Sequence, residues 1–171
     1  MTATANLQVF VSLGTDHHPF ARLVEWVDRW AGDHPEVDCF IQHGTAPAPT
    51  NSAGSAVLRA EELRGRLGVA DVVVGHAGPG TIMDALAHGR TPIVVARLAR
   101  FGEVVDDHQV AFARVMATQG KAIVVDEEAG MRAALDAAVA DPASVRVDPR
   151  AQAGADAVVR RIGELIDGML R

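Results

Sequence analysis

Short runs rich in valine and isoleucine recur along the chain and alternate with segments of helical spacing. Most of these runs are apolar at every position rather than at every second one, which is typical of strands buried on both faces of a sheet. The runs predict five strands, at Gln8–Leu13, Val37–Gln42, Asp71–Gly75, Thr91–Ala96 and Lys121–Val125.

Apolar residues three or four positions apart lie between these runs and predict helices. The residues with this spacing are Phe20, Leu23, Val24, Val27 and Trp30, then Leu63 and Leu67, then Ile82 and Leu86, then Val110, Phe112, Val115 and Met116. Alternation of strand and helix predicts an α/β protein with a single Rossmann-like parallel sheet and helices on both faces.

Two regions depart from this alternation. The stretch Gly44–Ser55 is rich in Ala, Pro, Thr, Gly and Ser and predicts a loop, followed by a short strand at Ala56–Arg59. After a helix near Glu128–Ala140, the segment Asp141–Pro149 carries two prolines and predicts a change of chain direction.

We expect one α/β domain over residues 1–145 and a C-terminal amphipathic helix over residues 146–171. One face of that helix carries Val158, Ile162, Leu165, Ile166, Met169 and Leu170. Such a face is buried either against its own domain or against another protein, and the sequence leaves both arrangements open.

Composition narrows the class of protein. The apolar fraction is 49% and the formal net charge is -6, whereas nucleic-acid-binding proteins present a basic face. Cys39 is the only cysteine, so a disulfide framework and a thiolate zinc cluster are both excluded. Met1–Asn6 lacks the features of a signal peptide, and no apolar run reaches the roughly 18–20 residues that cross a bilayer. We expect a cytoplasmic protein with no nucleic-acid partner.

Two strand-to-helix junctions have small residues where a parallel sheet binds ligands. Main-chain N–H groups and the positive end of the next helix converge there and favour phosphate. The first junction, Gly14-Thr15, follows an apolar strand and precedes Pro19-Phe20, where a helix can begin. An ordinary strand-to-helix turn has the same composition, so this junction is weak on its own.

The second junction, Gly75–Thr81, is richer in glycine. The run Val72-Val73-Val74 enters it directly, and Thr81 stands at the N-cap or in the first turn of the next helix. Its glycines let a ligand approach the backbone, and His76 adds a hydrogen-bond donor for a diphosphate. Met83 stands where the dinucleotide fingerprint needs glycine or alanine, which disfavours NAD.

Two carboxylates near these junctions have alternative interpretations. Asp84 follows Thr81 by three positions, so it either completes a capping box or accepts hydrogen bonds from a ribose diol. Asp107, followed by His108 and Gln109, either begins a solvated helix or binds sugar hydroxyls beside the glycine junction. The sugar-binding interpretation requires the strands Asp71–Gly75 and Thr91–Ala96 to be neighbours.

Three elements in this order resemble the C-terminal, donor-binding domain of GT-B glycosyltransferases of the family 28 type. Leu13–Leu23 is similar to V-G-T-H-x-x-P-F-x-R-L of bacterial exopolysaccharide and capsule subunits, His76–Thr81 to H-A-G-x-G-T, and Arg97–Gln109 to R-x-x-x-x-G-E-x-x-D-D-H-Q. The resemblance covers nearly the whole chain. It extends to the catalytic subunit of the eukaryotic two-subunit UDP-GlcNAc transferase, which is a stand-alone form of this domain.

The resemblance implies a role for each matched residue. The residues that would face the donor diphosphate are Gly14, Thr15, His76, Ala77, Gly78, Gly80 and Thr81. Asp84, which is glutamate in many relatives, would hold the ribose, and uracil would bind near Leu58–Leu63. Asp107, His108 and Gln109 would contact the donor sugar, and Arg97 and Glu103 would make further loop contacts.

The implied reaction transfers a hexose or N-acetylhexosamine from a UDP-sugar to a lipid-linked or polysaccharide acceptor, without a cofactor. A complete GT-B enzyme needs two α/β domains. The resemblance therefore implies a membrane-anchored, acceptor-binding partner that recruits this chain to the inner face of the membrane. Without that partner the docking surface would be exposed, so we expect self-association of the isolated chain. Two alternatives stay open: a non-catalytic subunit that stabilises or regulates another transferase, and an unrelated nucleotide-binding protein such as a single-domain oxidoreductase.

Asp16, His17 and His18 are residue types that ligate metals, and Asp16 stands where the family motif has histidine. Three adjacent residues rarely point at one ion, so we expect a solvated or acceptor-facing loop and no metal. The base that deprotonates the acceptor is not assigned by the sequence. His17 is the residue of this chain considered for that role, and a base on the partner is the alternative.

Overall fold

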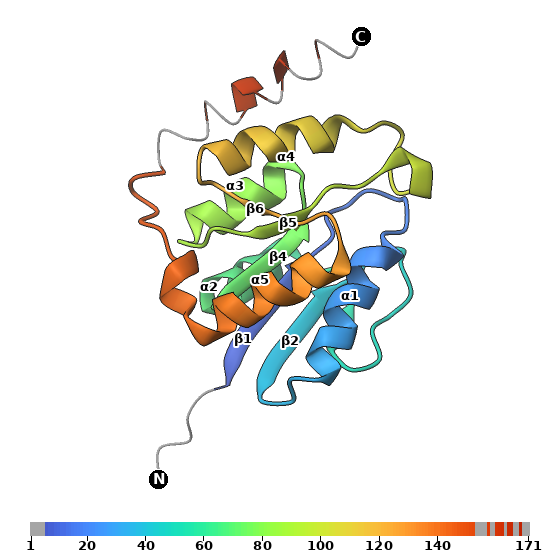
Figure 1. Cartoon of the computed structure of the whole chain (residues 1–171), viewed down its shortest axis with the longest axis vertical. Coiled ribbons are helices and arrows are strands. Elements are labelled where there is room, and N and C mark those ends of the chain that lie inside the picture. Colours follow the sequence, from blue (N-terminus) through green and yellow to red (C-terminus); the bar gives the residue numbers. More distant parts are fainter. Residues whose placement is uncertain (1–5, 153–156, 158–159, 163, 166–167, 169–171) are drawn as a thin grey trace.

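A six-stranded parallel sheet forms the centre of the computed structural model (Figure 1). The structure describes residues 6–152, 157, 160–162, 164–165 and 168. The strands are β1 Leu7–Ser12, β2 Val37–Gln42, β3 Ala53–Ser55, β4 Val72–His76, β5 Ile93–Val95 and β6 Ile123–Val124. They lie in the order β3-β2-β1-β4-β5-β6, and every pair of neighbours is parallel.

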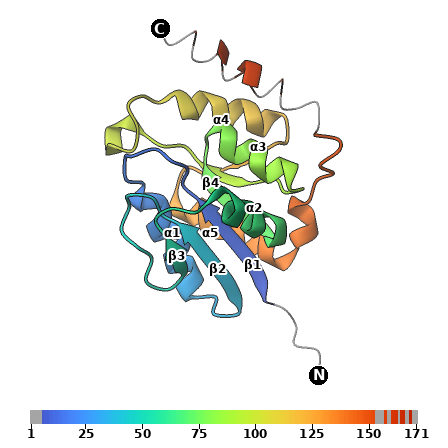
Figure 2. The same cartoon turned by 180° about the vertical axis from the view of Figure 1, so that it is seen from behind.

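Helices cover both faces of this sheet. Their bounds are α1 Ala21–Gly32, α2 Ala60–Val69, α3 Pro79–Ala87, α4 His108–Thr118 and α5 Glu128–Ala140, with short 3-10 segments at Ala99–Phe101 and Pro142–Val145. Figures 1 and 2 show α1 and α5 on one face and α2 and α3 on the other. The predicted α/β, Rossmann-like architecture is confirmed.

The alternation of side chains along β1 and β4 explains why their sequences are apolar at every position. Val9 and Val74 point to the face covered by α1 and α5 and belong to the largest buried cluster. Phe10 and Val73 point the other way and pack with Leu67 of α2. Because both faces are covered, neither set of positions tolerates a polar side chain.

The strand order reverses direction between β1 and β4. After β1 the chain adds β2 and β3 on one side, and it then returns to place β4, β5 and β6 on the other. Loops leaving the carboxyl ends of β1 and β4 therefore diverge, and the space between them is where open α/β sheets bind ligands.

The predicted short strand at Ala56–Arg59 is wrong, because the third strand is formed by Ala53–Ser55 within the predicted loop. These small residues have little intrinsic strand propensity. They pair with Phe40–Gln42 at the sheet edge. The preceding residues 50–52 are held in place by hydrogen bonds to the buried carboxylate of Asp28. Of the five other predicted strands, Val37–Gln42 has the predicted bounds, and each of the remaining four differs from prediction by one or two residues at each end.

The segment after α5 returns to the sheet before the C-terminal region begins. The N–H of Thr91 donates to the carbonyl of Val145 at 2.8 Å, and the N–H of Val147 donates to Gly89 at 3.0 Å. The expected division between residues 145 and 146 falls within this tethered stretch.

The expected C-terminal helix is only partly covered by the described residues. Ile162 packs against the buried cluster formed by α3 and α4, whereas Leu165 is 60% exposed. The remaining positions of the apolar face, Val158, Ile166, Met169 and Leu170, lie outside the described residues. Among the helices that the structure does describe, none has the length and apolar character needed to span a membrane.

We predict that Asp28→Asn lowers the free energy of unfolding by about 2 kcal/mol at pH 7, because it disrupts hydrogen bonds to a buried charged group. The Asp28 carboxylate accepts from the N–H groups of Thr50, Asn51 and Ser52 at 2.8 to 3.2 Å. Burial acts to raise its pKa, but these bonds hold the pKa below its usual value.

Urea denaturation from pH 7 to pH 3 checks this prediction. A depressed folded-state pKa stabilises the protein above the unfolded pKa, and that contribution is lost as pH falls through the folded value. The difference between wild type and Asp28→Asn should therefore shrink in acid. Asp38→Asn, which alters an exposed strand carboxylate, is the matched control, and equal destabilisation by both variants would contradict the assigned role.

Candidate functional site

A cleft of about 570 Å³ opens where β1 and β4 end. Most of the residues predicted from the two glycine junctions line it, namely Gly14, Thr15, His76, Gly78, Gly80 and Thr81. Asp84, His108 and Gln109 complete the predicted set in the same cleft, together with Ser12, Asp16, Leu63, Pro79 and Val104. Four separate parts of the sequence thus meet at the point where the strand order reverses.

The His76 side chain is wedged between the two glycine junctions. A Cβ atom at Gly14 or at Gly78 would collide with its imidazole ring, and Gly14 also has a positive φ of 74°. These two glycines therefore make room for the histidine. Gly80 differs, because a Cβ there would meet no atom within 4 Å. Gly80 is the position where a ligand can approach the backbone.

Hydrogen bonds fix which nitrogen of His76 carries its proton. The main-chain N–H of Arg97 donates to Oε1 of Gln109 at 3.1 Å, which turns the Gln109 amide nitrogen toward Nδ1 of His76 at 3.4 Å. An amide NH₂ only donates, so Nδ1 accepts and Nε2 holds the proton. Burial, aided by the nearby Arg97 charge, lowers the pKa of His76 to about 4. The ring is a neutral N–H donor at physiological pH.

The first turn of α3 supplies main-chain donors. Gly78 is the N-cap, Pro79 occupies the first helical position, and no side chain caps the helix end. The N–H groups of Gly80 and Thr81 consequently have no partner within the helix, and the helix dipole adds positive potential at this end. Of the two predicted positions for Thr81, the N-cap and the first turn, the structure shows the first turn.

The capping interpretation of Asp84 is wrong. The helix begins at Pro79, so Asp84 lies in the second turn, beyond the positions that cap an N-terminus. Its exposed side chain instead lines the cleft. Desolvation in the cleft wall raises the pKa of Asp84, and His88 opposes that rise. This carboxylate is therefore available as a hydrogen-bond acceptor for a ligand.

A second hollow of about 420 Å³ adjoins the cleft. Ser12, Gly14, Thr15, Asp16 and Leu63 line both, and Val57 and Leu58 give the second hollow an apolar wall. The stretch Leu58–Leu63, predicted to hold a base, thus contributes both of its ends to this wall.

Gln42 lines the second hollow, and the sequence had not marked it as a site residue. It is buried at the end of β2, where its Oε1 accepts from the N–H of Leu13 at 3.1 Å. Its amide nitrogen donates to Gly14 and Ala56 at 3.2 and 3.0 Å. A polar residue ending an apolar strand was the sequence signal that could have identified it.

Arg97 and Glu103, which were expected to make further loop contacts, do not line the cleft. Arg97 is 1% exposed, and its guanidinium donates to the carbonyls of Leu13, His18 and Glu103 at 2.8 to 2.9 Å. Glu103 is 3% exposed and accepts from the main-chain N–H of Leu98. Both residues fix the loops that form the cleft walls.

Arg22 of α1 is a further residue whose role the sequence analysis missed. Its guanidinium makes two hydrogen bonds to the carboxylate of Glu103, at 2.9 and 2.8 Å, and one to the carbonyl of Ala96. It also lies 5.2 Å from the ring centre of Phe101. The ion pair with Glu103 joins α1 to the loop after β5.

Two other predicted contacts need correction. Ala77 is fully buried, and its N–H donates to the carbonyl of Val95 at 3.0 Å, so it offers nothing to a diphosphate. Asp107 does not line the cleft, because its carboxylate accepts from the N–H of Ala99 at 2.8 Å. His108 does line the cleft, and its Nδ1 pairs with Asp106.

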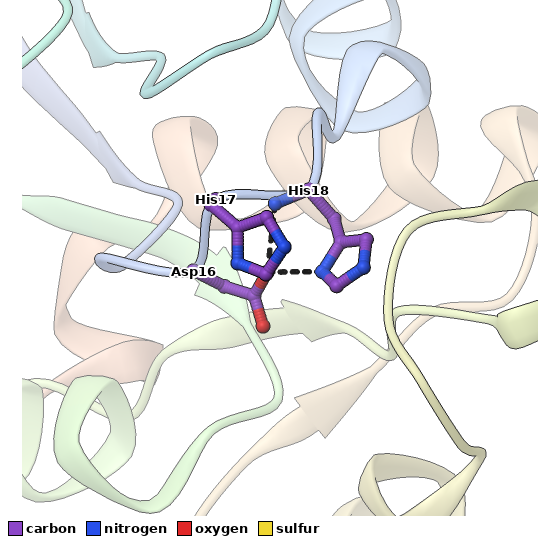
Figure 3. Close-up of side chains that lie close together, drawn as sticks. All are labelled: Asp16, His17 and His18. Carbon is purple, nitrogen blue, oxygen red and sulfur yellow. Dashed lines mark hydrogen bonds and ion pairs between the residues drawn. The ribbon is translucent and has the colours of Figure 1, made fainter.

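The three residues Asp16, His17 and His18 form the turn between β1 and α1 (Figure 3). Asp16 lines both hollows and His17 lines the second one. The side chain of His17 is 85% exposed, and that of His18 is 25% exposed.

A family model described as the glycosyltransferase family 28 C-terminal domain matches residues 9–158. The chain belongs to this family. The matched range contains both hollows and each of the side chains that line them.

Among curated proteins, this family 28 domain is similar to the UDP-N-acetylglucosamine transferase subunit ALG13 of Yarrowia lipolytica. The two are 36% identical over 53 residues, which is 31% of this chain and 25% of the yeast protein. The chain thus spans about a quarter of that relative.

Solved structures share the fold at low sequence identity. The glycotransferase of kitacinnamycin has a TM-score of 0.65 and 23% identity, over 98% of this chain and 44% of its own. MurG of Acinetobacter baumannii gives 0.58 and 20%, over 98% and 51%. The solution structure of ALG13 gives 0.55 and 18%, over 83% of this chain and 88% of its own. The family 28 domain therefore spans about half or less of the first two structures.

We predict that the stability of this family 28 domain depends on pH through His76. Its folded-state pKa of about 4 lies below the ordinary value of 6.5. The unfolded chain therefore binds one more proton between these values, and stability is lost as pH falls from 6.5 to 4. Between pH 6.5 and pH 4, the free energy of unfolding of the wild type should fall more steeply with decreasing pH than that of His76→Gln. The two slopes should differ by about 1.4 kcal/mol per pH unit at most.

Urea denaturation at closely spaced pH values checks the His76 prediction. His17→Gln removes an exposed imidazole from the neighbouring loop and serves as the control. Parallel curves for wild type and His76→Gln would show that His76 is not held neutral by the fold.

Proposed function

We propose that this domain is the donor-binding part of a glycosyltransferase that transfers a hexose or N-acetylhexosamine from a UDP-sugar to a lipid-linked or polysaccharide acceptor. The observation that carries the proposal is the pair of adjoining hollows at the strand reversal. One hollow has an apolar wall, and the other combines helix N–H donors, a neutral imidazole and a carboxylate. Membership of the family supports a transferase.

The parts of a UDP-sugar fit this division of chemistry. Uracil occupies the hollow walled by Leu58 and Leu63, where apolar side chains flank its faces. The ribose diol donates to Asp84, which lines the cleft on the α3 side. The diphosphate accepts from the N–H groups of Gly80 and Thr81 and from Nε2 of His76. The dipole of α3 favours the same negative charge.

His108 and Gln109 lie at the start of α4 and face the cleft, so we assign them to the transferred sugar. Gln109 already uses its Oε1 for Arg97 and one amide proton for His76. Its second amide proton is the group left for a sugar hydroxyl. Because Gln109 also orients His76, replacing it would weaken UDP binding as well as alter sugar choice.

Transfer breaks the bond between the anomeric carbon of the sugar and the β-phosphate oxygen, and the electron pair leaves with UDP. The developing charge on that oxygen is stabilised by preorganised donors, which need no reorganisation during the reaction. In this site those donors are the first turn of α3 and the neutral N–H of His76. A neutral donor is suited to the role because it binds the phosphate without requiring acid conditions.

The acceptor is assigned to a membrane-anchored partner, which would bring this chain to the cytoplasmic face of the membrane. Both hollows open at one end of the α/β domain that the structure describes. The yeast relative is named a transferase subunit, which supports an enzyme formed by this chain together with a second protein. The general base that deprotonates the acceptor hydroxyl would then lie near the interface between the two proteins.

Calorimetric titration of the purified chain with UDP, UDP-GlcNAc, UDP-glucose, UDP-galactose and NAD tests the proposal. We expect binding of UDP and of at least one UDP-sugar, and no heat with NAD. Binding of NAD in preference to every UDP ligand would contradict the proposal and favour an oxidoreductase. Binding of UDP-sugars with no turnover in the presence of the partner would favour a non-catalytic subunit.

We predict that Asp84→Ala weakens UDP binding by about 10- to 100-fold, the equivalent of one hydrogen bond to a charged group. Asp107→Ala is the matched control, because that carboxylate lies in a neighbouring loop but is turned toward Ala99. Equal UDP affinities for Asp84→Ala and wild type would overturn the ribose assignment.

The raised pKa of Asp84 adds a pH dependence to this prediction. A ribose diol donates to the ionised carboxylate, so wild-type affinity should fall as pH drops through the folded-state pKa of Asp84. The affinity of Asp84→Asn for UDP should lack this pH dependence and vary with pH only through the titration of UDP itself. Calorimetry of both proteins from pH 8 down to pH 4, close to the ordinary pKa of an aspartate, separates the two, and identical pH profiles would contradict the assignment.

A further inference from the structure

The turn between β1 and α1 folds back so that three consecutive side chains face one another (Figure 3). Oδ1 of Asp16 lies 2.6 Å from Nδ1 of His18 and 3.9 Å from Nδ1 of His17. The two imidazole rings lie 4.1 Å apart between centres, at 36° to each other. One ligand atom from each residue lies within 4.8 Å of the others.

The backbone conformation removes the objection that adjacent residues point apart. The main-chain N–H of His18 donates to Oδ1 of Asp16 at 2.8 Å, which closes a tight turn around the carboxylate. This turn brings residues 16 and 18 to the same side. His17, which lies between them, packs its ring against that of His18 rather than turning away.

The spacing of these atoms suits a small dication. Zinc bonds of about 2.0–2.2 Å to nitrogen and carboxylate oxygen place neighbouring tetrahedral ligands roughly 3.4 Å apart. The two distances from Asp16 lie on either side of that value. An ion at this turn would lengthen the shorter separation and shorten the longer one, and the three ligand atoms already lie within 4.8 Å of one another.

We propose that Asp16, His17 and His18 form a binding site for one divalent ion of the zinc type, at the rim of the cleft. Three protein ligands leave a coordination position open. Asp16 lines both hollows, so an ion on its carboxylate lies beside any ligand bound there. The site is a property of the turn and does not depend on the proposed transferase activity.

A second turn of the same form supplies an internal control. Asp106 accepts from the main-chain N–H of His108 at 3.0 Å and also pairs with its Nδ1. The residue between them, Asp107, has its carboxylate directed to the N–H of Ala99. This second turn therefore offers two ligands and lacks the third.

Isothermal titration of the full chain with zinc chloride, in a buffer that does not chelate zinc, tests the site. We expect one equivalent of zinc to bind. His18→Gln, His17→Gln and Asp16→Asn should each weaken zinc affinity by at least about tenfold, because loss of even a residue that only supports a metal ligand costs about that much. His108→Gln should leave zinc affinity unchanged. Cobalt(II) in place of zinc should give the intense visible absorption of a tetrahedral site in wild type and not in Asp16→Asn.

Three results would overturn the proposal. The first is no zinc binding at a protein concentration of tens of micromolar. The second is zinc binding that Asp16→Asn leaves intact, which would indicate an adventitious pair of surface histidines. The third is equal loss of affinity in His108→Gln and His18→Gln, which would place the ion in the cleft. Circular dichroism of each variant establishes that it is folded.

Discussion

The arrangement of the site depends on the hydrogen bonds made by the buried guanidinium of Arg97. It donates to the carbonyl of Leu13 at the end of β1, to His18 in the following turn, and to Glu103 in the loop after β5. Its main-chain N–H orients Gln109, which in turn fixes His76. A buried cation is tolerated only when it is hydrogen-bonded and its charge is balanced. Here Asp16 and Glu103 supply that balance.

The strand order explains why so many loops must be fixed at one place. Because the sheet reverses between β1 and β4, the loops leaving these strands diverge and expose the first turn of α3. Gln42 at the end of β2 bonds the loop after β1, and the polar network of Arg97, Glu103 and Arg22 joins that loop to the one after β5. His76 fills the gap between Gly14 and Gly78. The donors of the cleft are therefore held in position before a ligand arrives.

Much of the fold follows from the sequence because burial on both faces leaves an unambiguous pattern. Val72–Val74 is apolar throughout, and such a run admits few alternatives to a central strand. The strand Ala53–Ser55 could not be predicted in this way, since its pairing depends on Asp28, which is distant in sequence and holds residues 50–52.

The candidate site was predictable in type but not in detail. The glycine junctions indicated where a ligand would bind, yet the sequence could not show that Gly14 and Gly78 accommodate His76 while Gly80 remains open. Arg97 was expected to make a loop contact, but the sequence did not show that its guanidinium is buried. Its contacts with Leu13, 84 positions away in the sequence, are long-range and have no local signature.

The central claim is that the donor diphosphate binds where β1 and β4 diverge. Titration of UDP into the ¹⁵N-labelled chain, followed by amide chemical shifts, tests it most directly. The account predicts that the largest changes occur at Gly14, Thr15, Gly78, Gly80 and Thr81, with little change at the opposite end of the sheet around Glu36 and Val37. Changes concentrated at that opposite end, or saturable UDP binding that leaves the α3 amides unmoved, would contradict it.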